Sequence, residues 1–167
     1  MLETGLAIAL AFTGFIRSLS GTVVTIDTGA PTMLMVRAES QFQSFPVAQQ
    51  AVVERESRFV GSAAAATARI DRSDLAPGEY VRLEIDAGVV THVRAVVSIE
   101  RAKVRSASGR NVVLEDGTTL TISSVLRFLT AEGKPSTTAT VRPGDGVLLF
   151  RHPETRNIYQ FSAEALR

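Results

Sequence analysis

The chain contains no cysteine and no tryptophan, and only two of its 167 residues are tyrosine. The missing cysteine excludes disulfides, thiolate catalysis and zinc or iron–sulfur sites built on cysteine. It leaves the redox compartment open, because cysteine-free chains are tolerated in every compartment. The shortage of large aromatic rings leaves few platforms on which a nucleic-acid base or a sugar can stack.

An excess of charge of either sign is also missing. The chain has 18 basic and 17 acidic residues, for a net charge of +1. Dedicated nucleic-acid-binding proteins usually carry a strong basic excess, so the composition argues against nucleic acid as the partner. Apolar residues make up 45% of the chain, which is enough for a packed interior, and the length suits one medium domain or two small ones.

Motifs for catalysis and cofactor binding are absent from the sequence as well. There is no Gly-x-Ser-x-Gly, P-loop, Gly-x-Gly-x-x-Gly or EF-hand pattern. We expect His92 to face outward from a strand and His152 to lie in a surface turn, and neither has the spacing of a metal ligand. Pairs of carboxylates occur in expected turns or on the outward side of strands: Asp71 and Asp74, Glu84 and Asp86, Glu115 and Asp116. The sequence therefore predicts no enzyme, no cofactor and no metal, with a hydrolase acting through the turn carboxylates as the enzymatic alternative.

What the chain does contain is an internal repeat. Two stretches follow the same order of strand, hairpin, Pro-Gly-acidic turn and strand: Gly21–Asp27 with Pro77–Leu83, and Gly109–Asp116 with Pro143–Leu149. Each closes with a second strand, at Val89–Val97 and at Ile158–Phe161. A repeat of this kind indicates one small β unit used twice.

The alternation of apolar residues sets the expected boundaries. It changes parity after Glu100, which indicates a bulge or a boundary between units there. We therefore expect an apolar N-terminal segment at 1–19, a first unit at 20–100 and a second unit at 101–167. The first unit has an insertion at 43–69, in which Val47–Glu56 is expected to form a short helix after Pro46.

The shared order of Gly-x-Val-Val, Arg-Phe-[Val/Leu] and Pro-Gly-[Glu/Asp]-x-Val-x-Leu resembles that of small OB-like or SH3-like β-barrels. Such barrels occur as tandem domains of unknown function in bacterial envelope and secreted proteins. The resemblance covers most of residues 17–165, and the long insertion departs from its compact pattern. It implies an all-β fold of two tandem small β-barrels and carries over no catalytic residues.

The N-terminal residues Gly5–Ile16 are apolar on every side. Twelve residues are too few to span a bilayer, which takes about 20, and a signal peptide would have a charged start. An apolar stretch has to be buried against the protein's own core, a partner subunit or a membrane surface. The candidate partner-binding residues are Leu6, Ile8, Leu10, Phe12, Phe15 and Ile16.

Arg101, Lys103 and Arg105 form the clearest charge feature, because strand alternation places all three on one face. Such a stripe can protect a sheet edge from pairing with another chain. It can also meet an anionic surface, either lipid headgroups or nucleic-acid phosphates.

Together these features predict a non-enzymatic binding or scaffold subunit, an accessory component of a larger envelope or membrane-associated assembly. Its expected partners are other protein subunits and a membrane surface. The alternative is an OB-like module that binds single-stranded nucleic acid. The expected location is the bacterial envelope or a membrane, with the cytoplasm as the other option.

Overall fold

A computed structural model of the protein describes residues 16–136 and 141–164. The all-β prediction is confirmed: these residues form twelve strands and one turn of 3-10 helix, Arg72–Asp74. The strands are β1 (Arg17–Asp27), β2 (Met33–Ala38), β3 (Gln41–Phe59), β4 (Ala65–Arg69), β5 (Tyr80–Asp86), β6 (Val89–Ser108), β7 (Asn111–Leu114), β8 (Thr119–Thr121), β9 (Arg127–Leu129), β10 (Pro135–Ser136), β11 (Gly146–Arg151) and β12 (Ile158–Ala163).

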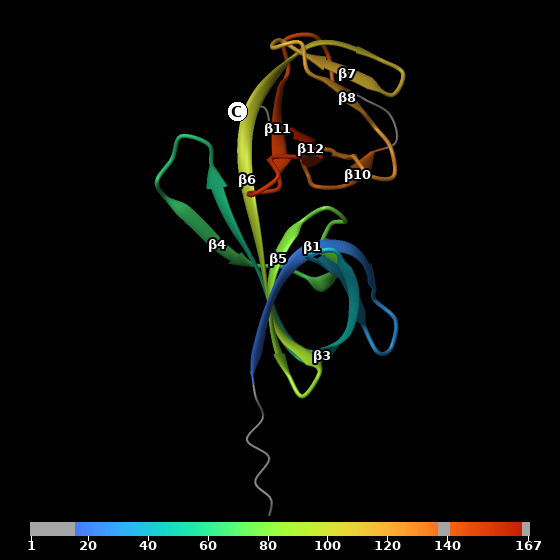
Figure 1. The fold of residues 1–167 in the computed structure, drawn as a ribbon. Coiled ribbons are helices and arrows are strands. Elements are labelled where there is room, and N and C mark those ends of the chain that lie inside the picture. The colour runs from blue at the N-terminus through green and yellow to red at the C-terminus, as the bar shows by residue number, and fades with distance from the viewer. Residues whose placement is uncertain (1–15, 137–140, 165–167) are drawn as a thin grey trace, which may run out of the picture.

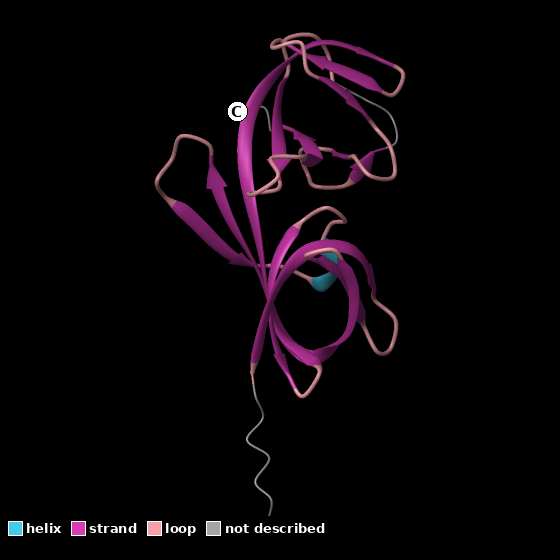
Figure 2. Cartoon of the chain, in the orientation of Figure 1, coloured by secondary structure: helices cyan, strands magenta, loops and turns pink. Residues whose placement is uncertain are grey.

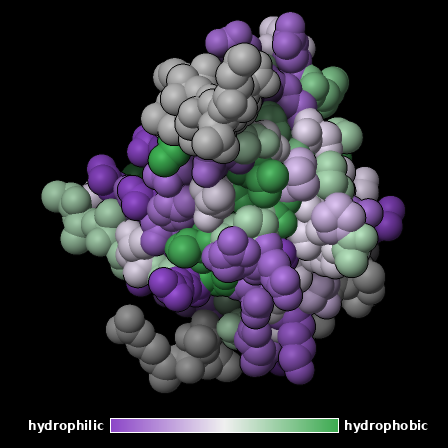
Figure 3. Space-filling view, turned by 90° about the horizontal axis from the view of Figure 1, so that it is seen from below, coloured by the Kyte–Doolittle hydropathy of each residue, from purple (hydrophilic) through white to green (hydrophobic). Residues whose placement is uncertain are grey.

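Five strands of the first half close into a ring, in the order β1, β2, β3, β6, β5 and back to β1 (Figure 1). All neighbours are antiparallel except β3 and β6, which run parallel. One face of each strand points into the ring, where Leu34, Val36, Val81 and Val93 are fully buried. Seen from the ring end, hydrophobic residues gather near the middle of the surface with hydrophilic ones around them (Figure 3).

The second half is built on the far end of β6. There β6 pairs with β11 and then with β7, β11 pairs with β12, and β12 runs parallel to β9. Its separate core includes Val104, Leu114, Phe128 and Phe161. The rings of Phe128 and Phe161 lie 4.8 Å apart between centroids.

Strand β6 passes from one core to the other without a break at Glu100. Its pairing with β11 runs without a shift from Ser98 to Lys103. From Val93 to Ile99 the odd-numbered residues of β6 are buried, first in the core of the ring and then in an apolar cluster between the halves, whereas Ala102 and Val104 face the core of the second half. The alternation of apolar residues changes parity because opposite faces of β6 are buried in the two halves. The expected boundary at Glu100 lies inside this continuous strand.

The repeated turns before β5 and β11 have the same hydrogen bonds. In the first, Gly78 N donates to Val23 O at 2.8 Å and Val23 N to Glu79 O at 2.8 Å. In the second, Gly144 N donates to Val104 O at 2.7 Å and Val104 N to Asp145 O at 2.9 Å. Each acidic side chain also accepts from the N–H three residues before it, Glu79 at 3.0 Å and Asp145 at 2.7 Å. The sequence repeat is therefore a structural repeat at these two turns.

Two local expectations were wrong. The residues 47–56 are not helical but belong to the 19-residue strand β3. Pairing with β6 is interrupted between Val47 and Val52, so the alternation that marks a strand is lost there. The similarity of the segments around Phe59 and Phe128 also does not reflect equivalent positions. Phe128 lies opposite Phe161 in the strand pairing of the second half, as Val53 lies opposite Val93 in the first. The residue that matches Phe128 is therefore Val53 and not Phe59.

Past Val53, β3 stays paired with β6 as far as Phe59, and on its other side it pairs with β4, which forms the end of the sheet (Figure 2). The two halves contact each other through a third apolar cluster, in which Ala76, Val97, Ile99 and Tyr159 are buried. This contact fixes the surface that forms the candidate site.

Candidate binding groove

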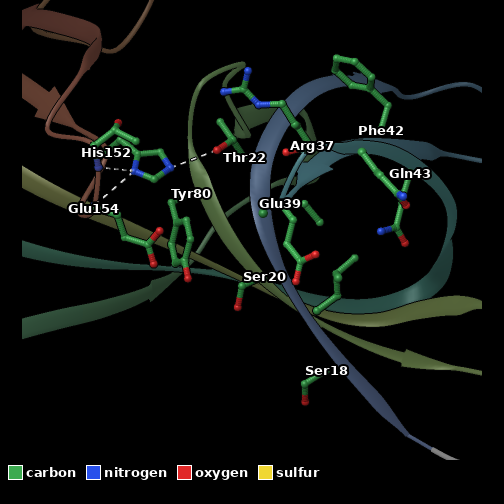
Figure 4. A pocket seen from close by; sticks show the side chains of 16 residues that line it. Ser18, Ser20, Thr22, Arg37, Glu39, Phe42, Gln43, Tyr80, His152 and Glu154 are labelled. Atoms are coloured by element: carbon green, nitrogen blue, oxygen red, sulfur yellow. Dashed lines mark hydrogen bonds between the residues drawn. The ribbon is translucent and has the colours of Figure 1, made fainter.

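An open groove runs along the outer face of β1, where the two halves meet (Figure 4). Its volume is about 940 Å³. Residues 18–22 of β1 form its floor. The turn between β2 and β3 forms one wall, and the turn between β11 and β12 forms part of the other.

The floor carries unpaired backbone groups. Val23 N donates to Glu79 O, so Val23 is hydrogen-bonded toward β5. Because every second residue of an antiparallel strand bonds to the same neighbour, Leu19 and Gly21 also direct their N–H and C=O groups to β5. The backbone N–H and C=O groups of Ser18 and Ser20, which lie between these residues, therefore point away from β5. Strand β2 reaches β1 only from Thr22 onward. Among the described residues, no strand pairs with this edge of β1 at Ser18 and Ser20.

The wall from the β2–β3 turn combines charge and one aromatic ring. Phe42 is 66% exposed, which is unusual for so large an apolar side chain. Arg37 and Glu39 also line the groove and bring opposite charges to it. Arg17 Nη2 donates to Gln43 Oε1 at 3.3 Å and so ties the start of β1 to this wall.

The opposite wall is held in place by His152, whose expected surface position was wrong. Its side chain is only 4% exposed, and its Nδ1 accepts from the backbone N–H groups of Glu154 and Thr155, both at 3.2 Å. Nε2 therefore carries the proton and donates to Thr22 Oγ1 at 3.0 Å. The imidazole also lies edge-on to Tyr80, with centroids 5.1 Å apart.

Burial lowers the pKa of His152 below its ordinary value of 6.5; Glu154 opposes this shift and Arg37 adds to it. The ring is therefore neutral near pH 7. Both of its nitrogens are engaged, so it acts as a clamp between the second half and β1 rather than as a free base.

A buried ion pair forms at Glu79, the residue before Tyr80, which lines the groove. Glu79 is fully buried and accepts from Arg55 through two bonds, from Nε at 2.6 Å and Nη2 at 3.1 Å. Burial works against the charge of Arg55, but the hydrogen bond and field of Glu79 outweigh it and raise the pKa of Arg55. Burial raises the pKa of Tyr159 well above its ordinary value, and the nearby Glu79 charge acts in the same direction. The pair thus joins β3 to the turn before β5.

The stripe of Arg101, Lys103 and Arg105 lies on the exposed side of β6, on one face as expected. Arg101 Nε donates to Glu164 Oε1 at 3.0 Å, and its guanidinium stacks over Phe59 at 4.6 Å from the ring centroid. Glu115, Asp116 and Glu164 line the same shallow depression as Arg101 and Lys103. Carboxylates therefore offset much of the positive charge of the stripe.

Most of the expected partner-binding residues lie outside the described part of the chain: Leu6, Ile8, Leu10, Phe12 and Phe15. Ile16, the last of them, is described and is 68% exposed. Among the described residues, no helix is long and apolar enough to cross a membrane.

The remaining polar candidates lie on the surface. The six carboxylates singled out in the sequence are all exposed. His92 is partly buried between Glu54, 3.1 Å from its Nε2, and Glu84, 3.6 Å from its Nδ1. Within residues 16–136 and 141–164, no group of three or more His, Cys, Asp and Glu side chains is arranged to hold a metal ion.

Apart from His152, the groove residues were not among the sequence candidates. Their only signal is the alternation of Ser18, Ser20 and Thr22 with Leu19 and Gly21, which marks a strand with a hydroxyl-lined outer face. Nothing in the sequence shows that β2 stops short of that strand. No protein-family model matches this chain, and no curated protein matches it either.

Proposed function

We propose that the protein is a non-enzymatic binding subunit that holds an extended segment of another protein in the groove along β1. The single observation that carries the proposal is the unpaired edge of β1 at Ser18 and Ser20. An added strand would satisfy these N–H and C=O groups, which is how many proteins bind extended peptides.

The walls fit such a ligand. Phe42 offers an apolar surface for one side chain of the bound segment, and Arg37 and Glu39 offer charges of both signs. Polypeptides present both kinds of group at short intervals, whereas a phosphate backbone is uniformly negative. The clamp made by His152 keeps the second wall in position without the ligand.

The proposal includes two tandem OB-like β-barrels. Its support is the five-stranded ring with one parallel pair, β3 with β6, and the corresponding parallel pair of β9 with β12 in the second half. The equal turns at Glu79 and Asp145 support the same interpretation. In this arrangement β6 is the last strand of the first barrel and the first strand of the second.

We also propose that the bound protein belongs to a larger envelope or membrane-associated assembly. The support for this part is the apolar segment Gly5–Ile16 and the absence of a catalytic motif from the sequence. Binding of a peptide in the groove along β1 does not require such an assembly.

The test is selection of peptides from a displayed random library against the protein, followed by binding measurements on variants. Ser20→Pro removes an N–H that faces the groove and leaves the ladder with β5 intact. We expect selected peptides to lose about tenfold or more in affinity for this variant and for Phe42→Ala. The control is Arg105→Ala, on the exposed face of β6, which should bind as the wild type does. Failure to select any peptide, or equal affinity for Ser20→Pro, would remove the proposal.

A second candidate is an OB-like module for single-stranded nucleic acid, favoured by the ring topology and by Arg37 and Phe42 in the groove. Carboxylates of Glu39 and Glu154 line the same groove and would repel phosphates. Salt-dependent binding of a single-stranded oligonucleotide that is lost in Arg37→Ala would favour this candidate. No binding at low salt would eliminate it.

A further inference from the structure

The hairpin of β3 and β4 ends the path of hydrogen-bonded strands with an open edge. Within the part of the chain that the structure describes, strand β4 pairs only with β3, and all five of its residues, 65–69, are exposed. Figures 1 and 2 show β4 on the outer side of β3, away from β6. The outer edge of β4 is remote from the groove along β1 and belongs to a different surface.

The pairing with β3 determines which backbone groups of this edge are free. Ile70 N donates to Val53 O at 3.0 Å, and the same register pairs Arg69 with Glu54. Hydrogen-bonded pairs alternate in an antiparallel ladder, so Ala66 and Ala68 bond to β3. The N–H and C=O groups of Ala65, Thr67 and Arg69 point away from β3.

This edge lacks the features that usually prevent edge pairing. Natural edge strands are blunted by lysines, prolines, bulges or inward-pointing charges. Strand β4 reads Ala-Ala-Thr-Ala-Arg, with one charge at its end, and its register with β3 has no irregularity. The small side chains leave room for another strand at the normal spacing.

The free groups are arranged symmetrically about Thr67, with Ala65 two residues before it and Arg69 two residues after it. A second β4 related by a two-fold axis at Thr67 would pair Thr67 with its own copy and Ala65 with Arg69. Every outward N–H and C=O of both strands would then be satisfied. The two Arg69 side chains would lie at opposite ends, about 14 Å apart along the strands. A parallel arrangement would instead place them side by side.

We propose that two copies of this chain associate through antiparallel pairing of their β4 edges, with the two-fold axis at Thr67. The interface of a single short strand is small, so the dimer is weak and the dimeric fraction rises with protein concentration. This dimerisation is separate from the binding function proposed above. Its consequence is that the dimer displays two copies of the groove. A partner with two binding segments would therefore be held more tightly than by one copy.

Cysteine cross-linking tests the register directly, because the natural chain contains no cysteine. In the proposed dimer the two Thr67 Cα atoms face each other at about 5.5 Å, within the span of a disulfide. We expect Thr67→Cys to form a disulfide-linked dimer as the main product under mild oxidation. Arg69→Cys, two residues along the same edge, should remain monomeric. Failure of Thr67→Cys to cross-link, or equal cross-linking at Arg69→Cys, would overturn the proposal.

Sedimentation velocity over a range of concentrations gives an independent measurement on protein without cysteine. Thr67→Pro removes an outward N–H and leaves the bonds to β3 intact, so it should weaken association about tenfold or more. Thr67→Ser keeps the N–H and should associate as the wild type does. A wild type that remains monomeric at all concentrations would overturn the dimer, while peptide binding in the groove would be unaffected.

Discussion

The buried pair of Glu79 and Arg55 allows the sharpest test of what stabilises the first half, because it joins β3 to the turn before β5. Replacing Glu79 with alanine leaves the guanidinium of Arg55, whose side chain is only 20% exposed, without its partner. It also leaves the buried N–H of Ala76 without its acceptor at 3.0 Å. Breaking a buried ion pair from one side costs about 3–5 kcal/mol, which is a large part of the stability of a typical domain.

The repeat supplies a matched control. Asp145 occupies the same place in the second turn, where it accepts from the N–H of Arg142 at 2.7 Å and makes no ion pair with any described residue. Because it loses only a hydrogen bond, Asp145→Ala should cost about 1 kcal/mol. Replacing both members of the pair, by Glu79→Leu with Arg55→Met, should cost less than Glu79→Leu alone, because no buried charge is left.

Urea unfolding followed by tyrosine fluorescence measures these differences, since the chain has no tryptophan and its two tyrosines are buried. A loss of about 3 kcal/mol moves the unfolding midpoint down by about 1–2 M urea. If Glu79→Ala and Asp145→Ala lower the free energy of unfolding by the same amount, the ion pair does not have the role assigned to it here.

Further predictions concern the turn glycine and the histidine clamp. Gly78 has φ of +89°, and a Cβ there would lie 2.6 Å from Tyr159 Cβ, whereas Gly144 has φ of +91° and open space around it. Gly78→Ala should therefore destabilise by about 3 kcal/mol and Gly144→Ala by about 1 kcal/mol in the same urea assay; equal losses would contradict the close contact. The pKa of His152 is lowered in the folded state, so the unfolded state binds the proton more readily, and the melting temperature should fall as pH drops below 6.5. His152→Gln should be less stable at pH 7 and should lose part of this slope, and an unchanged slope would count against the neutral clamp.

The fold class follows from the sequence because turn residues and alternating apolar residues reveal strands directly. The residues Val81, Leu83 and Ile85 alternate as a strand must, and all three are buried. The repeated Pro-Gly-acidic motifs likewise predict the two turns with matching hydrogen bonds before β5 and β11. Strand β3 was missed around residues 47–56, because its irregular pairing with β6 conceals the alternation.

The site was harder to predict, because it depends on where strands end relative to one another. His152 lies next to Pro153 in a turn, which suggests a surface residue, yet Thr22 and Tyr80 from the other half bury it. Glu79 looks like a turn carboxylate, and only Arg55, 24 residues away, shows that it is an internal charge. Contacts between residues far apart in the chain have no local signature in the sequence.

The most direct test of the central proposal is hydrogen exchange of individual amides, followed by NMR with and without a peptide selected for binding. In the free protein, the N–H groups of Ser18 and Ser20 should exchange much faster than those of Leu19 and Gly21. The bound peptide should slow Ser18 and Ser20 by about tenfold or more, because they become part of a ladder. Protection of Ser18 and Ser20 in the free protein, or no change on binding, would contradict a peptide strand added to β1.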